Sequence, residues 1–221
     1  MAVITISRQF GSGGGEVAAR VCELLGYLYL DKLLMTQVAS EVGLSGKELA
    51  GLSEQHRTLS KYLERLLLPG PHDVARVSVR DREAGGAEML TVKHLDVWRS
   101  ASLVQTAIHT AYQRGNVVIL GRGGQAVLQK MPGVLHVRIE APMGDRILRI
   151  QGREKLDAER ARQLALENDQ ASSQYLKRLF NIRWDDPNLY HLLVNTGKWE
   201  LEAAAQIIVQ AVTLLPEERI V

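Results

Sequence analysis

The chain has 221 residues, of which 46% are apolar, so it is long enough to bury one sizeable hydrophobic core. Its 27 lysines and arginines against 25 aspartates and glutamates leave a net charge of +2, which gives no global electrostatic reason to bind nucleic acid or a membrane. The sequence has no apolar run of about 18 residues, the length of a membrane span. The single cysteine, Cys22, has no intrachain disulfide partner, which suits a reducing, cytoplasmic compartment.

Two short strands and a helix are predicted at the start of the chain. Ala2 to Ser7 is β-branched, apolar and followed at once by glycines, which indicates a buried strand. The next segment, 16–25, places its apolar residues, Cys22 among them, on one helical face and ends at Gly26, a typical C-cap. Residues 27–30 form a second strand candidate.

The middle of the chain contains one irregular segment and then regains a clear pattern. Residues 43–96 combine a polar helix candidate, a Pro-Gly-Pro turn and a charged stretch, so we expect an inserted, partly mobile segment there. A helix over 98–114 is followed by apolar strands over 117–120 and 134–140.

The last third is predicted to hold two basic helices, near 143–151 and 157–178, a core strand over 191–195 and an amphipathic helix over 201–215. That last helix is apolar enough to cover either its own sheet or a second copy of the chain. The sequence therefore does not decide whether the chain forms a homodimer. Short apolar strands alternating with helices predict a parallel sheet covered on both faces, with ligands beyond the carboxyl ends of its strands. This rule indicates three loops as candidate sites: Arg8 to Glu16, Leu120 to Gly124 and Asn195 to Lys198.

A glycine loop lies between the first strand and the first helix. It consists of Gly11, Ser12, Gly13, Gly14 and Gly15. Backbone N–H groups in such a loop can converge on an anion, and the helix N-terminus adds a favourable dipole. The loop therefore predicts a phosphate cradle, and a plain flexible turn is the alternative.

Five fragments together resemble the cytidylate-kinase-like family. They are ITISRQFGSGGGEVA, LYLDK, VVILGRGG, VLHVRIEAP and LLVNTGKW, and they follow the family's order across residues 2–214. The resemblance implies an α/β P-loop kinase fold of three layers, with a parallel sheet flanked by helices. It also implies one domain over 1–221, with a helical insert on the acceptor side at 43–96 and a lid at 143–180.

The resemblance further implies an ATP-dependent phosphotransferase that uses Mg²⁺. Its partners would be a nucleotide donor and a small phosphate acceptor, a nucleoside monophosphate with cytidylate as the family's default. A catalytically degenerate nucleotide-binding or interaction protein with the same fold is the alternative.

The glycine loop departs from the usual P-loop at its charged positions. Gly14 occupies the place of the phosphate-binding lysine, Gly15 that of an arginine common in the family, and Glu16 that of the hydroxyl that holds Mg²⁺. We predict that Arg8 supplies the missing positive charge, the alternative being a surface arginine beside the loop. Glu16 could ligate Mg²⁺ itself or merely complement the helix dipole.

Further candidate site residues come from the other loops. The resemblance implies that Arg122 contacts the acceptor phosphate, although Leu120 and Gly123 replace the acidic residues expected around it. It also implies that Asp31 orients the acceptor, for which a helix N-cap is the alternative. Thr196 and Lys198 follow the last strand, where related kinases hold the donor base.

The first basic helix carries three arginines at helical spacing, Arg146, Arg149 and Arg153. In the kinase interpretation this helix leads into the lid, and Arg149 and Arg153 act on the transferred phosphate. A solvated basic face is the alternative. In the second lid helix Asn168, Gln170 and Ser172 replace basic residues of relatives, which weakens the case for catalysis.

Overall fold

A computed structural model describes residues 2–31 and 97–215 of the chain. The predicted insert at 43–96 and the helix expected after Asp31 lie outside the described residues. Within the described ranges, the predicted elements occur in the predicted order, with bounds that differ by a few residues.

Five parallel strands form one sheet in the order β2-β3-β1-β4-β5. Their bounds are β1 Val3–Arg8, β2 Leu28–Leu30, β3 Val117–Leu120, β4 Val134–Glu140 and β5 Leu192–Asn195. The carboxyl ends of β1 and β3 therefore lie side by side at one edge of the sheet. This arrangement confirms the predicted parallel sheet, and it brings the loops after these strands together.

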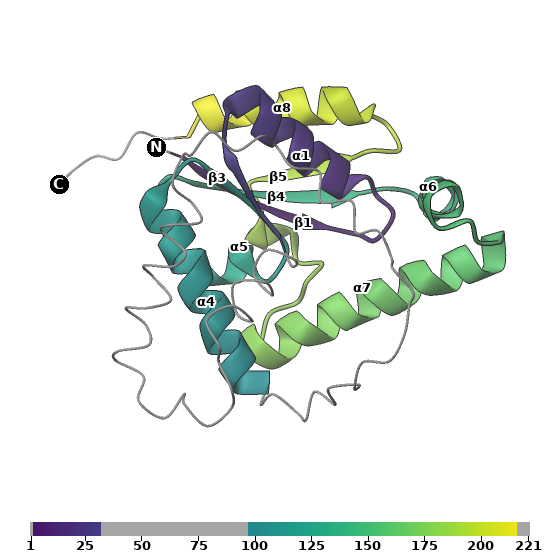
Figure 1. Cartoon of the computed structure of the whole chain (residues 1–221), viewed down its shortest axis with the longest axis horizontal. Coiled ribbons are helices and arrows are strands. Elements are labelled where there is room, and N and C mark those ends of the chain that lie inside the picture. The colour runs from purple at the N-terminus through teal and green to yellow at the C-terminus, as the bar shows by residue number, and fades with distance from the viewer. Residues whose placement is uncertain (1, 32–96, 216–221) are drawn as a thin grey trace, which may run out of the picture.

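Helices cover both faces of the sheet (Figure 1). The helices are α1 Gly14–Leu25, α4 Val97–Arg114, α5 Gly124–Val127, α6 Met143–Glu154, α7 Ala158–Phe180 and α8 Leu201–Thr213, with a short 3₁₀ helix at Pro187–Leu189. Helices α1 and α8 pack on one face, while α4 and α5 pack on the other. The long helix α7 lies on the same side of the sheet as α4. It connects to α6 beyond the carboxyl ends of the strands (Figure 1).

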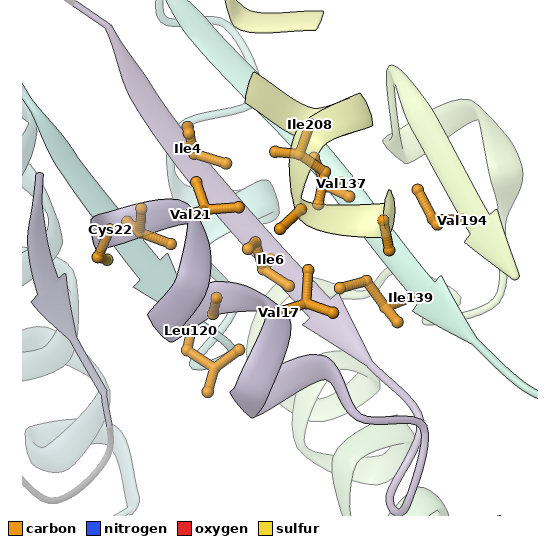
Figure 2. Packing of buried hydrophobic residues seen from close by; sticks show 14 of the residues in the cluster. Ile4, Ile6, Val17, Val21, Cys22, Leu120, Val137, Ile139, Val194 and Ile208 are labelled. Atoms are coloured by element: carbon orange, nitrogen blue, oxygen red, sulfur yellow. The ribbon is translucent and has the colours of Figure 1, made fainter. Parts of the chain in front are cut away.

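The main core lies between the sheet and the α1–α8 layer (Figure 2). Alternate residues of the central strands, such as Ile4, Ile6 and Val137, face Val17 of α1 and Ile208 of α8. Cys22 belongs to this core, as predicted, and burial raises the pKa of its thiol to about 12. The α8 helix thus covers its own sheet.

The opposite face of β1 and β4 carries a buried row of polar residues. Thr5 is in register with His136, and Ser7 with Arg138, and all four side chains are almost completely buried. The Thr5 hydroxyl lies 2.7 Å from Nδ1 of His136. Strand β5, predicted as a core strand, is instead an edge strand in which Val194 is buried and Leu193 is 46% exposed.

Buried His136 makes stability depend on pH. Burial and the neighbouring His191 lower the pKa of His136 from 6.5 to about 4, so the folded protein holds a neutral imidazole. In the unfolded chain this imidazole binds a proton near pH 6.5. The folded protein therefore has its full free energy of unfolding above pH 6.5 and loses part of it as the pH falls toward 4. We expect a loss of roughly 3 kcal/mol over this window, measurable by urea unfolding at several pH values.

The control for this expectation is a comparison of two histidine variants. His136→Gln should flatten the pH dependence between pH 6.5 and 4, whereas His109→Gln, at an exposed position of α4, should leave it unchanged. Equal pH profiles for wild type and His136→Gln would contradict the assignment.

Candidate functional site

The glycine loop turns from β1 into α1 and leaves a set of backbone donors at the helix N-terminus. Gly11 and Gly13 have φ angles of 80° and 78°, which glycine adopts without strain. The Ser12 hydroxyl donates to the Gln9 carbonyl at 2.8 Å and tightens the turn. N–H groups in the first turn of a helix lack intrahelical acceptors, so this N-terminus favours an anion.

Three other elements hold the glycine loop in place. The Phe10 N–H donates to Asp169 of α7 at 2.8 Å, and the Phe10 carbonyl accepts from Arg146 of α6 at 2.8 Å. Arg146 and Asp169 also form an ion pair at 2.5 Å. On the other side, the Thr196 hydroxyl donates to the Ser12 carbonyl at 2.6 Å. The loop is therefore fixed by α6, α7 and the segment after β5.

The remaining arginines of α6 also contact this region. Arg149 donates to the Thr196 carbonyl at 2.7 Å, and the Arg153 guanidinium lies 5.1 Å from the centre of the Phe10 ring. The three arginines of α6 thus share one face, as predicted, but Arg146 is buried within the protein rather than facing solvent. Arg149 is half-buried and Arg153 is exposed, so a solvated face remains the alternative for these two arginines.

Arg8 extends from the end of β1 across the glycine loop to the loop after β3. A Cβ placed on Gly14 would lie 2.5 Å from Cβ and 2.8 Å from Cγ of Arg8, so the arginine stem passes directly over Gly14. A Cβ on Gly121 would lie 2.4 Å from Nη1 of Arg8, so the guanidinium rests against that glycine. Arg8 is therefore half-buried and lies against both loops.

The groups around Arg8 shift the pKa of its guanidinium in opposite directions. Burial lowers the pKa of its guanidinium, and Arg122 acts in the same direction. Tyr29 and Asp31 oppose this shift, which places both near Arg8. The structure thus gathers Arg8, Asp31 and Arg122 at the carboxyl ends of β1, β2 and β3, three of the residues singled out in the sequence.

A cavity of about 320 Å³ opens beside Arg8. Its walls come from the ends of β1 and β3, the loop after β3, helices α5 and α7, and Trp184. The lining residues are Ser7, Arg8, Leu120, Gly121, Arg122, Gly123, Gln125, Asn168, Ala171, Ser172, Tyr175, Leu176 and Trp184. Two of them, Arg8 and Arg122, carry a charge, and none of the lining residues is a carboxylate. The cavity is therefore suited to a small anionic group.

Arg122 enters the cavity from a strained backbone. Its φ angle is 56°, between Gly121 at 74° and Gly123 at 77°. A left-handed conformation at a residue other than glycine costs on the order of 1 kcal/mol, and the surrounding structure must hold the residue in it. Phe180 and Leu176 of α7 pack against Gly123, where a Cβ would meet Phe180 at 2.6 Å, and they hold the loop in this conformation.

Other predicted site residues lie apart from the cavity. Glu16 is exposed in the first turn of α1, and Lys198 is exposed after β5. Thr196 is buried and connects the segment after β5 to the glycine loop. In the described ranges 2–31 and 97–215, no group of three His, Cys, Asp or Glu side chains gathers into a metal-binding cluster.

Three cavity residues of α7 follow one another at helical spacing. The sequence singled out Asn168 and Ser172 only as replacements of basic residues, and it did not single out Tyr175. Asn168, Ser172 and Tyr175 lie at positions i, i+4 and i+7, a signal that would have placed them on one face. Trp184 is buried and also lines the cavity. Trp199, by contrast, is 52% exposed.

The fold and the glycine loop together define an α/β P-loop kinase fold. The sequence matches the family model of the Cytidylate kinase-like family over residues 3–198, and the chain belongs to that family. At the level of the family this places it among nucleotide-binding, kinase-type proteins. No helix in the described part of the chain is long and apolar enough to span a membrane.

Individual relatives are distant but cover most of the chain. A cytidylate kinase from Methanocaldococcus jannaschii is 22% identical over 213 residues, which are 95% of this chain and 97% of the relative. One from Halobacterium salinarum is 27% identical over 178 residues, 80% of this chain and 92% of the relative. The crystal structure of an uncharacterized protein from Eubacterium ventriosum superimposes with a TM-score of 0.65 at 18% identity, covering 97% and 99% of the two chains.

Proposed function

We propose that this protein transfers a phosphoryl group from ATP to a nucleoside monophosphate, with cytidylate as the first candidate acceptor. The observation that carries the proposal is the cavity beside Arg8, which is lined by two arginines and by no carboxylate. Such a cavity favours a phosphate-bearing acceptor over a neutral or cationic one. Family membership and the cytidylate kinases among its relatives support the same assignment.

In this proposal the glycine loop and the N-terminus of α1 bind the donor phosphates. Arg8 lies between that loop and Gly121, so its guanidinium is placed to contact oxygens of the transferred group. Arg122 holds the acceptor phosphate in the cavity. Because an acceptor phosphate is already anionic, it needs no general base, and positioning plus charge stabilisation carry the reaction.

Arg8 takes over the role of the lysine found in common P-loops. Its stem occupies the space where a side chain at Gly14 would begin, so the two positions cannot both carry a long side chain in this conformation. A guanidinium binds phosphate oxygens through two N–H groups and does not require the lysine's backbone position.

Mg²⁺ would be held mainly by the nucleotide phosphates, with Glu16 as a carboxylate that the protein can add. When bound, the ion offsets the negative charge of those phosphates. Arg149 and Arg153 extend the positive charge around the donor side, and Thr196 and Lys198 adjoin the place of the donor base.

A non-catalytic nucleotide-binding protein is the second candidate. Leu120 and Gly123 stand at the two acidic positions of the family's acceptor loop, and Asn168 and Ser172 line the cavity where basic residues are expected. These substitutions remove charge that would act on the transition state while leaving room for a ligand.

Thermal unfolding with a nucleotide panel tests whether a ligand binds. ATP, CMP, UMP and AMP are each added with Mg²⁺, and a ligand at 100 times its dissociation constant adds about 2.7 kcal/mol of stability. For a chain of this size that corresponds to roughly 5–10 °C in Tm. We expect ATP and one monophosphate to reach this range, and release of ADP only when both are present.

Two glycine variants provide matched controls for this test. Gly13→Ala should abolish stabilisation by ATP, because Gly13 has a φ of 78° and a Cβ there would lie 2.5 Å from Leu201. Gly26→Ala carries similar backbone strain at the end of α1 but meets no atom within 4 Å, so it should retain the full ligand shift. Stabilisation without ADP release would favour the non-catalytic protein, and no stabilisation by any nucleotide would refute both candidates.

A further inference from the structure

We propose that the hydroxyl of Tyr175, on α7, donates a hydrogen bond to the acceptor's phosphate and forms with Arg122 a two-residue clamp for that group. This inference rests on the proposed function and names a further residue that binds the substrate. It is carried by the place of Tyr175 in the wall of the cavity, by the nearby Arg122 and by the lack of any acceptor for the phenolic proton among the described residues.

The Tyr175 hydroxyl is buried and lacks a hydrogen-bond partner of regular geometry among the described residues. Arg122 lies close enough to lower the pKa of this phenol, although burial has the larger effect and raises the pKa overall. A guanidinium can only donate hydrogen bonds. Arg122 therefore cannot accept the phenolic proton, which has no acceptor in the described part of the protein.

An uncompensated buried hydroxyl is costly, and native structures contain few of them. The cost is removed if a ligand oxygen enters the cavity and accepts from Tyr175 and Arg122 together. A phosphate oxygen has several lone pairs and full negative charge, and hydrogen bonds to charged groups are about twice as strong as neutral ones. The raised pKa keeps the phenol protonated, and so able to donate, at neutral pH.

The Tyr175 ring is held in position by the same contacts that shape the Arg122 loop. Phe180 packs edge-to-face on Tyr175, with ring centres 6.4 Å apart and an interplanar angle of 68°. The Phe180 ring also packs against Gly123, next to Arg122. Helix α7 thus fixes the phenol and the arginine relative to one another before any ligand binds.

The test compares Tyr175→Phe with wild type, using whichever of CMP, UMP and AMP binds wild type most tightly. Removing an uncompensated hydroxyl should leave the Tm of the ligand-free protein unchanged or higher. We expect the affinity for the monophosphate to fall by about tenfold or more, because a hydrogen bond to a charged group is lost. Affinity for ATP should stay within about twofold, as should any weak affinity for the corresponding nucleoside. Calorimetry gives all three dissociation constants.

Tyr112→Phe is the matched control, because the Tyr112 hydroxyl bonds the Pro132 carbonyl on the surface, away from the cavity. This variant should bind the monophosphate as wild type does. If wild type binds the monophosphate and Tyr175→Phe binds it equally well, the clamp is refuted and the proposed function stands. If wild type binds none of the monophosphates, the proposed function fails, and this inference fails with it.

Discussion

Arg8→Ala should slow phosphoryl transfer by a factor of about 10³ or more while leaving the protein folded. Loss of one arginine contact to a transferred phosphoryl group costs about 10³ to 10⁵ in rate in related chemistry, and here no lysine at position 14 can compensate. The affinity for ATP should fall as well, because the donor phosphates would then face backbone dipoles and the more distant arginines of α6. ADP release with ATP and CMP measures the rate, and calorimetry measures the affinity.

Three further variants sharpen this result. Arg8→Lys should recover part of the lost rate, because a point charge cannot reproduce a two-point guanidinium contact. Gly14→Lys should restore activity only in an Arg8→Gly background, since the Cβ of any other residue 8 would lie 2.5 Å from the new Cβ. Arg20→Ala, on the exposed side of α1, is the control and should change nothing. Unchanged ATP binding in Arg8→Ala at equal stability would overturn the role of Arg8.

Arg146→Ala should lower the free energy of unfolding by about 3–5 kcal/mol and weaken ATP binding. This variant leaves Asp169 without its buried cationic partner and the Phe10 carbonyl without its donor, and breaking a buried ion pair costs this much. Because Arg146 connects the glycine loop to α6 and α7, the loop should also lose its fixed conformation. Urea unfolding gives the stability, and calorimetry with ATP gives the affinity.

Arg160→Ala is the matched control, since its ion pair with Glu167 is exposed and has a separation of 3.8 Å. Such a pair contributes about 0–1 kcal/mol, so both stability and ATP affinity should stay close to wild type. The stability and ATP affinity of Asp169→Asn should fall between those of Arg146→Ala and Arg160→Ala, because the amide oxygen can still accept from the Phe10 N–H. An Arg146→Ala protein as stable as wild type would show that the contacts of Arg146 with Asp169 and the Phe10 carbonyl contribute little to stability.

The local features of this protein follow from the sequence alone. Apolar strands, helical periodicity and glycine positions predicted the order of the elements, because these patterns act over a few residues and set backbone conformation and face. The glycine loop was located for the same reason. The core position of Cys22 followed from the apolar face of its helix.

Only the tertiary structure decided which of these features meet. Spacing placed three arginines on one face of α6, yet only packing against Asp169 shows that Arg146 is buried. The sequence assigned no contacts to His136 and Arg138 of β4, and the second covered face of the sheet buries both. Arg8 and Gly121, like Arg122 and Tyr175, are far apart in sequence, and they are neighbours because parallel strands and α7 converge at one edge. Contacts of this kind depend on how whole elements pack, which no local pattern encodes.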